Sequence, residues 1–482
     1  MPAVRAPALH ALRGGAAGLW TTDAGYGWLV TALIWLLVGL MTLPDNFDYT
    51  ALSAGGPPES GSAVSRLLWL TLLALPAVII VFRWSLALLV LRDLNFFIVV
   101  FALLTFASLL WSEFPAITAR RLIRVAAVMS SAVAFVLLSW HRTRFQSALR
   151  SALTAMLAGS LIFGLVRPDL AIHSETSPEL LHAWRGLTNH KNSLGAAACV
   201  TLILWFHAWL TGEAHKWIAL GGSAIAVACL VLSRSSTSMV DSVVVMAILA
   251  AIVRTPDRWR HWIPPVVTAF MVLLVIYALV ILRLLPGSSL LLSPINLITG
   301  KDLSFTGRTE IWDIIDHQVS LHPWLGAGYG AYWIGPEPWA PVHEFVEKLH
   351  FYPGQAHNGY LDVLNDLGIA GLSCLLCYLA VYMQDGLRLL AADRAQAALF
   401  LGLFLQQAIG NLTEAHWFSV QSLDFAIMAL ATVSLARSRL QLRLRYYFGE
   451  PPPVRVFCGT PQQWLVRQPQ PVLAPTTKPV TP

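Results

Sequence analysis

Long uninterrupted runs of apolar residues, separated by short polar connections, extend along most of the chain. Runs of about 17 to 25 apolar residues are long enough to cross a hydrocarbon core roughly 30 Å thick as helices. Because a helix satisfies its backbone hydrogen bonds internally, each run is predicted to be a membrane-spanning helix. The pattern predicts twelve spans, near residues 28–43, 66–82, 94–111, 122–139, 148–166, 193–210, 217–232, 238–253, 262–282, 366–383, 396–412 and 421–436.

Composition agrees with an all-α polytopic membrane protein. Of the 482 residues, 56% are hydrophobic and 12% are charged, and the mean hydropathy is +0.62. An average soluble domain has about 25% charged residues, so a water-soluble globule is excluded. The first span is interpreted as an uncleaved signal anchor. We interpret the cysteines as small core residues rather than redox or metal groups. They are Cys199, Cys229, Cys374, Cys377 and Cys458.

The positions of Lys and Arg predict the orientation of these spans. The loops 44–65 and 413–420 contain no Lys or Arg, whereas the alternate connections are basic. The excess of positive charge on cytoplasmic loops therefore places both termini in the cytoplasm. Residues 1–27 become a cytoplasmic N-terminal segment, residues 28–436 the transmembrane domain, and residues 437–482 a cytoplasmic, partly disordered tail.

This orientation puts one large loop, about residues 283–365, on the outer side of the membrane. It also puts several cations there, against the usual bias. They are Arg120, Arg121, Arg185, Lys191, Arg234 and Arg308. One outward arginine can simply cap a helix or pair with a lipid phosphate. As a set beside polar, turn-rich stretches, these residues favour anion binding.

Four polar residues, Asn189, His190, Lys191 and Asn192, gather where the sixth predicted span begins. The free N–H groups and the dipole at a helix N-terminus favour an anion, so these residues are candidate ligands. The same residues could serve only as a solvated helix cap.

A short helix is predicted just before these polar residues. The sequence Ser177-Pro178-Glu179 is typical of a helix start. It predicts a helix that lays Leu180, Leu181 and Trp184 along the membrane surface and ends near Gly186.

The large outer loop contains a predicted amphipathic helix over about residues 309–321. Ile311, Ile315 and Val319 recur every four residues, and Pro323 follows. Arg308 lies at the start of this helix, where its charge opposes the helix dipole. A bound phosphate would remove that conflict, which makes Arg308 a candidate phosphate ligand.

A glycine-rich turn follows, with Gly326, Gly328 and Gly330. No strand precedes these glycines and their spacing is not that of a dinucleotide-binding motif. We expect a turn that brings its aromatic residues to the surface, where they could stack on sugars or rest at the membrane interface. These aromatics are Tyr329, Tyr332 and Trp333.

Histidines recur every seven residues at His343, His350 and His357. A metal site is not expected, because the Pro353-Gly354 turn interrupts any helix that would align them and no accompanying carboxylate cluster is present. His357 lies at the outer rim, in the same loop as Arg308. Histidine, with an unperturbed pKa of about 6.5, can accept a proton near neutral pH. A purely structural capping role is the alternative for His357.

Six stretches, in this order, resemble the O-antigen ligase and polymerase superfamily of bacterial membrane glycosyltransferases, particularly its exopolysaccharide-production branch. They are WSEFP (111–115), RGLTNHKNSLG (185–195), LSRSSTS (232–238), FTGRTEIWDIIDHQVSLHPWLGAGYGAYW (305–333), AHNGYLDVLNDLG (356–368) and GNLTEAHW (410–417). The resemblance covers about residues 94–436. It implies a fold similar to the C-type membrane glycosyltransferases, and transfer of glycan from undecaprenyl diphosphate to a hydroxyl acceptor without metal, nucleotide sugar or other cofactor.

The resemblance also implies catalytic roles for His357, Arg308 and Arg185. Substrate binding is predicted for a second set, in which the match at Arg234 is looser and Arg120 rests on topology alone. This set is Lys191, Asn192, His190, Arg234, Arg120 and Asn358. The role of Asn411 and Glu414 is left open.

The predicted reaction is a single inverting displacement at the anomeric carbon of a lipid-linked sugar. Arginines stabilise the negative charge that grows on the departing diphosphate, and His357 accepts the proton of the attacking hydroxyl. The expected partners are the undecaprenyl-diphosphate-linked oligosaccharide donor, a glycan or lipid-linked acceptor, membrane lipid and other polysaccharide-assembly proteins. No nucleic-acid partner is expected. The expected location is the bacterial inner membrane, with the site on the periplasmic side.

Three alternatives stay open at this point. The protein could be a transporter of lipid-linked glycan, in which the intramembrane acid Asp241 relays protons. It could be a protein O-oligosaccharyltransferase, or a scaffold in an assembly complex. The sequence does not separate a polymerase from a ligase.

Overall fold

The computed structural model of the protein describes most of the predicted transmembrane domain. The described residues are 27–44, 49, 63–173, 180–281, 308–335, 338–350, 352–420 and 422–448. They form helices and loops without a β-strand, apart from one isolated bridge between Ile172 and Trp184. The predicted all-α class is confirmed. Most of the N-terminal segment, most of the tail and the first part of the outer loop lie outside the described residues.

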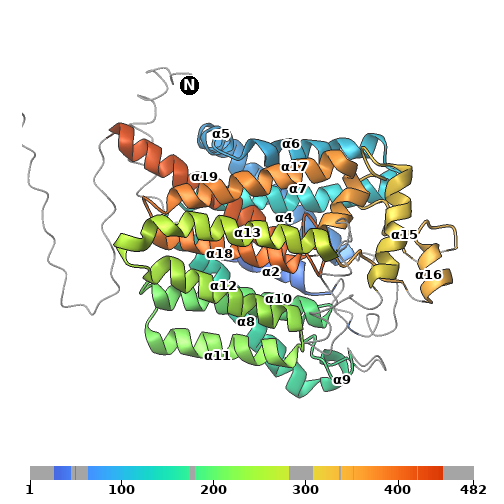
Figure 1. Ribbon diagram of the computed structural model, residues 1–482, viewed down its shortest axis with the longest axis horizontal. Coiled ribbons are helices and arrows are strands. Elements are labelled where there is room, and N and C mark those ends of the chain that lie inside the picture. The colour runs from blue at the N-terminus through green and yellow to red at the C-terminus, as the bar shows by residue number, and fades with distance from the viewer. Residues whose placement is uncertain are drawn as a thin grey trace, which may run out of the picture.

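Each of the twelve predicted apolar stretches coincides with a helix, and these helices run side by side as a bundle (Figure 1). They are α2 (Gly27–Thr42), α4 (Ala63–Phe82), α6 (Phe96–Ala107), α7 (Pro115–Leu138), α8 (Arg144–Val166), α10 (Lys191–Leu210), α11 (Lys216–Leu232), α12 (Ser236–Arg254), α13 (Ile263–Ile281), α17 (Gly359–Leu389), α18 (Arg394–Gly410) and α19 (Leu423–Phe448). By length and composition, seven helices of the described part could cross a membrane, or eight if one bent pair counts as a span. The protein is therefore consistent with a multi-pass membrane protein, and the number of twelve crossings stays a prediction.

The connection predicted over residues 83–93 is itself a helix, α5 (Trp84–Arg92), which is bent by 108° from the following helical segment Phe96–Leu110. That segment consists of α6 and a short 3-10 turn, η2 (Ser108–Leu110). Asn95 fixes the break, because its side chain accepts a hydrogen bond from the N–H of Phe97 and donates one to the carbonyl of Tyr378. The sequence pattern did not show this bend.

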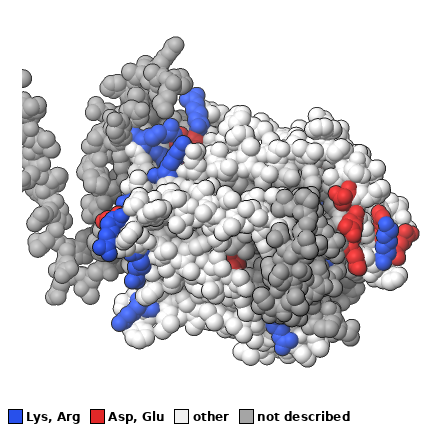
Figure 2. Space-filling model, in the orientation of Figure 1, with Lys and Arg blue, Asp and Glu red and all other residues white. Residues whose placement is uncertain are grey.

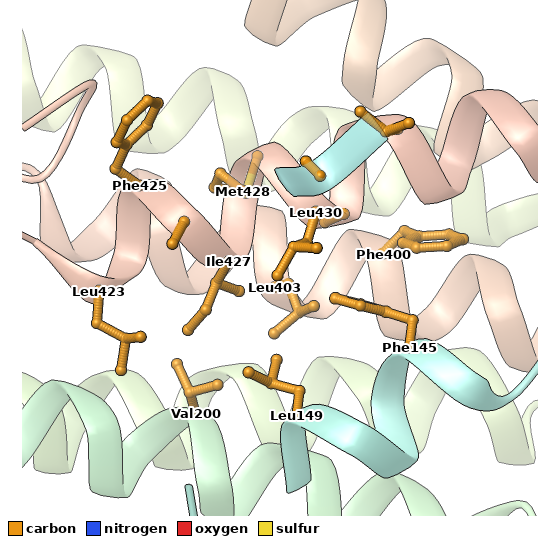
Figure 3. Packing of buried hydrophobic residues seen from close by; sticks show 14 of the residues in the cluster. Phe145, Leu149, Val200, Phe400, Leu403, Leu423, Phe425, Ile427, Met428 and Leu430 are labelled. Carbon is orange, nitrogen blue, oxygen red and sulfur yellow. The ribbon is translucent and has the colours of Figure 1, made fainter. Parts of the chain in front are cut away.

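The core of the bundle is formed around α18, whose residues are buried on all sides. Figure 3 shows its Phe400 and Leu403 among side chains from α8, α10 and α19. A helix that is apolar all round belongs in the interior, whereas α11, α12 and α13 bury only one side and expose large apolar residues on the other. Cys199 and Cys229 are buried as predicted, but Cys377 is exposed on α17.

Short helices and loops cover one end of the bundle: α9 (Pro168–Ala171), α15 (Arg308–Leu321) and α16 (His343–Leu349) (Figure 1). The helix predicted at 309–321 is confirmed as α15. The prediction of a short helix ending near Gly186 is wrong over residues 180–186, which form turns and the bridge at Trp184. The predicted start, 177–179, lies outside the described residues. The N–H groups of Arg185 and Gly186 bond instead to the carbonyl of Ala171.

The glycine-rich turn is present, but its aromatic residues are buried rather than exposed. Gly328 has a φ of +100° and an added Cβ there would lie 2.6 Å from the Cα of Ser112, so only glycine fits. The exposed fractions of Tyr329, Tyr332 and Trp333 are 6%, 1% and 7%. Tyr332 and Trp333 pack on Phe345 of α16 in a small core beneath α15. The prediction that these aromatic residues are exposed is therefore wrong, because the loop has its own hydrophobic core.

Charged residues divide between the two ends of the bundle. On the face in Figure 2, most Lys and Arg gather at the end opposite α15 and α16, while Asp and Glu gather over those two helices. At the basic end, Arg142 pairs with Asp393 at 3.0 Å and Arg439 pairs with Asp385. This asymmetry agrees with the predicted orientation, which places α15 and α16 on the outer side.

Candidate active site

A cavity of about 530 Å³ lies at the end of the bundle that carries α15 and α16. Its size is within the range of small-molecule sites. Segments far apart in the sequence line it, and they include the start of α10, the glycine-rich turn, the start of α17 and the loop between α18 and α19. Polar and titratable side chains face one another there. Those with a titratable side chain are Arg121, His190, Tyr329, Tyr352, His357, Asp362, Asp366, Glu414, His416 and Asp424.

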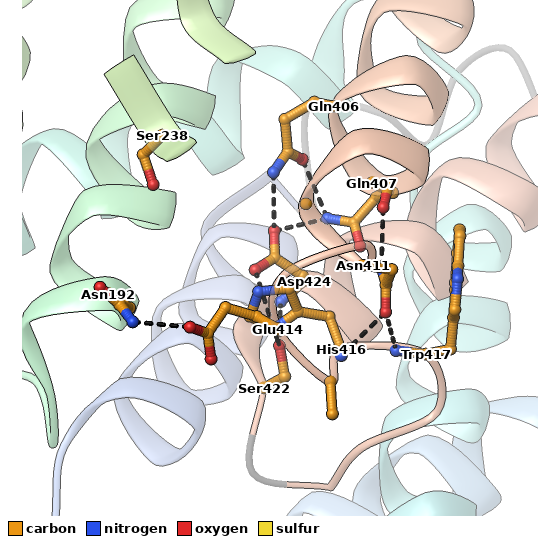
Figure 4. Close-up of polar contacts among 12 residues, drawn as sticks. Asn192, Ser238, Gln406, Gln407, Asn411, Glu414, His416, Trp417, Ser422 and Asp424 are labelled. Carbon is orange, nitrogen blue, oxygen red and sulfur yellow. Dashed lines mark hydrogen bonds and ion pairs between the residues drawn. The ribbon is translucent and has the colours of Figure 1, made fainter. Parts of the chain in front are cut away.

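The central contact of the cavity joins His357 to Glu414. His357 has a left-handed backbone with φ of +49° and lies two residues before the start of α17. Its Nδ1 lies 3.2 Å from Oε2 of Glu414. The same carboxylate accepts hydrogen bonds from Gln355 at 2.9 Å and from Asn192 at 2.6 Å, the latter drawn in Figure 4. Three segments of the chain, including the loop that carries Glu414, therefore meet at one buried acid.

The environment keeps Glu414 ionised. Burial alone would raise the pKa of the Glu414 carboxyl, but the hydrogen bond with His357 and the positive charges of His357, Arg308 and His416 outweigh burial and lower it to about 2. A carboxylate that accepts the Nδ1 proton of His357 leaves Nε2 as the basic nitrogen of the ring; this tautomer is assigned from the hydrogen bond. The arrangement suits His357 for accepting a proton.

Arg308 approaches the same acid from the first residue of α15. Its Nη1 donates to the carbonyl of Thr413 at 2.7 Å, and its Nη2 lies 3.6 Å from Oε1 of Glu414. The structure therefore brings Arg308 and His357 to one carboxylate. Arg308 is not among the residues that line the cavity, so its charge reaches the cavity through Glu414.

The polar residues at the start of α10 divide between the cavity and the helix cap. His190 and Asn192 line the cavity, and Lys191 does not. The Nδ1 of His190 accepts a hydrogen bond from the N–H of Asn192 and so caps the helix. Burial lowers the pKa of His190 to about 4, so its ring is neutral at pH 7. The capping alternative thus applies to His190, which still faces the cavity.

Arg185 is deeply buried and is not among the residues that line the cavity. Its Nε donates to the carbonyl of Leu170 at 2.8 Å. Its positive charge also acts on Tyr49, whose pKa burial raises to about 12. These contacts are those of a side chain that stabilises the loop after α9, and contact with substrate stays a prediction.

Three further candidates also lie away from the lining of the cavity. Arg120 is exposed and bonds to the carbonyl of Ala116, and Arg234 bonds to the carbonyl of Leu181. Asn358 is buried and caps α17, with Oδ1 accepting the N–H groups of Tyr360 and Leu361. Their predicted roles in substrate binding remain predictions.

Glu414 and Arg121 are among the cavity residues that were not predicted as site residues. Glu414 lies in the GNLTEAHW stretch, where an acid in an outer loop without Lys or Arg was the available signal. Arg121 lines the cavity and donates to the carbonyls of Gly330 and Trp333 at 2.7 and 2.6 Å. Adjacent residues on a helix point about 100° apart, so the sequence could not tell which of Arg120 and Arg121 faces inward.

No group of three or more His, Cys, Asp or Glu side chains suited to a metal ion occurs in the described part of the chain. His343 and His350 lie at the two ends of α16, and His350 has a left-handed φ of +61°. Their heptad spacing therefore does not bring these two rings to the His357 site.

Comparison with known proteins supports the motif analysis. Residues 221–376 match the O-antigen ligase family. The chain is 26% identical over 319 residues to the exopolysaccharide production protein ExoQ of Rhizobium meliloti (strain 1021), a match that covers 63% of this chain and 68% of that protein. Proteins named as putative polysaccharide ligases in Rickettsia prowazekii and Rickettsia typhi are 27% and 26% identical over 114 residues. Each match covers 23% of this chain and 28% of the relative.

These relatives support a role for the chain in polysaccharide biosynthesis. The region that matches the family includes most of α11, all of α12, α13 and α15, and the first half of α17. It therefore contains both Arg308 and His357. The matches confirm the predicted resemblance: the chain is similar to the O-antigen ligase superfamily and to its exopolysaccharide-production branch.

Proposed function

We propose that the protein is a membrane glycosyltransferase that moves glycan from undecaprenyl diphosphate to a hydroxyl acceptor during exopolysaccharide or O-antigen biosynthesis. The observation that carries this proposal is the pairing of His357 with ionised Glu414 at the wall of the cavity. A histidine held by a carboxylate is the usual arrangement for activating a hydroxyl group.

His357 acts as the general base. Its Nε2 takes the proton of the acceptor hydroxyl, whose oxygen attacks the anomeric carbon of the donor sugar. The bond from that carbon to the diphosphate oxygen breaks, and its electron pair leaves with the diphosphate. Glu414 orients the ring through Nδ1 and stabilises the positive charge that the ring acquires. One displacement of this kind inverts the anomeric centre.

Positive charge near the cavity stabilises the departing diphosphate. Arg121 lines the cavity and Arg308 pairs with Glu414. The N-terminus of α10, capped by His190, also faces the cavity. Because the guanidinium group of Arg308 contacts Thr413 and Glu414 and is not part of the cavity lining, Arg308 contributes through its positive charge rather than through direct phosphate contacts.

The site faces the periplasm in this proposal, with both termini in the cytoplasm of a bacterial cell. The concentration of Lys and Arg at the opposite end of the bundle supports that orientation. The donor is a lipid-linked oligosaccharide, and the acceptor is a second lipid-linked chain or another glycan. Other polysaccharide-assembly proteins are candidate partners.

Purified protein in lipid vesicles, supplied with lipid-linked oligosaccharide and acceptor, tests the proposal. A new glycosidic linkage, detected by mass spectrometry, supports a transferase, and movement across the vesicle without linkage indicates a transporter instead. Cells that lack the protein then separate two enzyme classes. Accumulated single repeat units on lipid indicate a polymerase, and finished polymer on lipid indicates a ligase.

A further inference from the structure

A second imidazole with a carboxylate partner faces the same cavity, and the mechanism above does not use it. His416 lines the cavity in the loop between α18 and α19. Its Nδ1 lies 2.8 Å from Oγ of Ser422 and 3.6 Å from Oδ2 of Asp424. Figure 4 shows the three side chains directed toward one another. Nδ1 is thus occupied, as Nδ1 of His357 is occupied by Glu414.

The carboxylate partner of His416 is itself held in place. Asp424 is 3% exposed, and its Oδ1 accepts hydrogen bonds from the side-chain amides of Gln406 and Gln407 on α18. Its backbone N–H donates to Oγ of Ser422 at 3.3 Å. Burying a carboxylate costs free energy unless hydrogen bonds and a positive charge compensate it. The nearby group that can supply that charge is the His416 ring.

The backbone on both sides of His416 is fixed as well. Oδ1 of Asn411 accepts the N–H groups of His416 and Trp417 at 2.9 and 2.8 Å, and its amide donates to the carbonyl of Gln407 at 2.8 Å. The backbone is therefore anchored at the C-terminal end of α18, and the ring is anchored at the start of α19. This degree of preorganisation is what a site needs to place a donor within a few tenths of an ångström.

The two carboxylates differ in their surroundings. The charge of Glu414 is partly balanced by Arg308, at 3.6 Å, and by the amides of Asn192 and Gln355. The donors found on Asp424, apart from the His416 ring, are neutral amides. The negative charge of Asp424 therefore acts on the His416 ring without a competing ion pair among these donors and strengthens its Nε2–H as a hydrogen-bond donor, so the two imidazoles are suited to opposite roles.

We propose that His416, oriented by Ser422 and Asp424, donates a hydrogen bond from Nε2 to the departing diphosphate while His357 accepts the proton of the acceptor. This inference rests on the proposed function. As the anomeric C–O bond breaks, its electron pair passes to the diphosphate oxygen, and the Nε2–H of His416 hydrogen-bonds to that oxygen. Asp424 is a positioning residue in this scheme, since it acts through His416.

The pH dependence of glycosyl transfer by the full-length protein tests this division of roles. The wild type is expected to show a bell-shaped profile of kcat/KM, with the acidic limb from His357 and the basic limb from His416. Other charged groups that face His416 are Asp424 and Glu414, and Arg121, His190, Asp362 and Asp366 line the same cavity. Substitutions are therefore required to assign the basic limb of the profile to His416.

His416→Gln keeps an N–H donor but loses the ring that can carry a positive charge, so kcat should fall about 10- to 100-fold. Because the amide does not titrate, the basic limb should disappear. Asp424→Asn should move the basic limb about one pH unit lower, because the protonated ring loses a negative neighbour. His322→Gln is the matched control, since that ring pairs with Glu113 at 3.1 Å outside the cavity; its profile should equal that of the wild type.

Binding of geranyl diphosphate, measured by calorimetry in detergent, provides a readout independent of turnover. Between pH 6 and pH 8.5 the affinity of the wild type should fall about tenfold more than that of His416→Gln, the cost of losing one charged donor, because ionisation of the diphosphate and of His357 affects both proteins. An unchanged basic limb in both His416→Gln and Asp424→Asn overturns the role of His416, even if transfer itself is observed. Absence of any transfer by the wild type defeats the proposed function instead.

Discussion

His357 and Glu414, which are 57 residues apart in the sequence, lie in direct contact, with Nδ1 and Oε2 3.2 Å apart. The contact ties the start of α17 to the loop between α18 and α19. Asn192 and Arg308 approach the other oxygen of the same carboxylate. Because one buried acid connects these segments, substitutions around it should change the rate of glycosyl transfer and the stability of the fold to different extents.

His357→Gln should abolish glycosyl transfer without preventing membrane insertion. The amide cannot accept the hydroxyl proton, and loss of a general base typically costs about 10²- to 10⁴-fold in rate. The measurement is product formation in vesicles, with insertion checked by protease protection. His317→Gln, at an exposed position on α15, is the matched control and should keep full activity. Polymer formation by His357→Gln at the wild-type rate would contradict the assignment.

Glu414→Gln should lower the unfolding temperature in detergent, by an amount that depends on pH. The pKa of Glu414, about 2 in the folded protein, is below the value of about 4.3 for an unfolded glutamate. Its ionised form therefore adds stability that is present above about pH 4.3 and is lost as pH falls toward 2. The difference between wild type and Glu414→Gln should shrink between pH 5 and pH 3. A difference that is constant over this range would refute the role of the charge.

Arg308→Lys should reduce transfer at least tenfold while leaving the fold intact. The guanidinium of Arg308 reaches both the carbonyl of Thr413 and the carboxylate of Glu414, and a lysine offers a single point of contact. Steady-state kinetics would measure the loss. Arg167→Lys makes the same chemical change in an exposed ion pair with Asp169 and is the control. This variant should keep the wild-type rate of transfer.

Arg185→Ala and Arg120→Ala should differ in stability. Arg185 is 2% exposed and bonds to the carbonyl of Leu170, so its removal should cost about 1.5–3 kcal/mol, typical of a hydrogen bond to a charged group. Removal of the exposed Arg120 side chain should cost less than about 0.5 kcal/mol of folding free energy. Thermal unfolding in detergent compares the two variants. A stable Arg185→Ala protein that has lost transfer would show instead that Arg185 acts on the substrate.

Gly328→Ala should destabilise the turn that carries the cavity residues Tyr329 and Gly330. The positive φ of +100° alone costs about 1–2 kcal/mol for alanine. The Cβ would also overlap the Cα of Ser112, which adds about 1–3 kcal/mol. Gly212→Ala is the control, because its φ is +74° but open space surrounds it. Equal unfolding temperatures for the two variants would show that the overlap between the new Cβ and Ser112 is relieved without loss of stability.

The amino-acid sequence alone predicted much of the local structure. Apolar runs located the twelve apolar helices of the bundle, because the hydrophobicity of a residue and the length needed to cross a bilayer can both be read along the chain. The four-residue spacing of Ile311, Ile315 and Val319 predicted α15, since that period belongs to one face of a helix. The ordered motifs indicated the family resemblance that the comparisons confirmed.

Only the tertiary structure decided which polar groups share a cavity. Arg121 rather than its neighbour Arg120 faces inward, Arg185 lies in the protein interior, and Glu414 connects the site although its role was left open. These outcomes depend on how each helix is rotated about its axis and how the outer loop packs. Many weak contacts between distant segments set that rotation and packing, and no local sequence pattern records them.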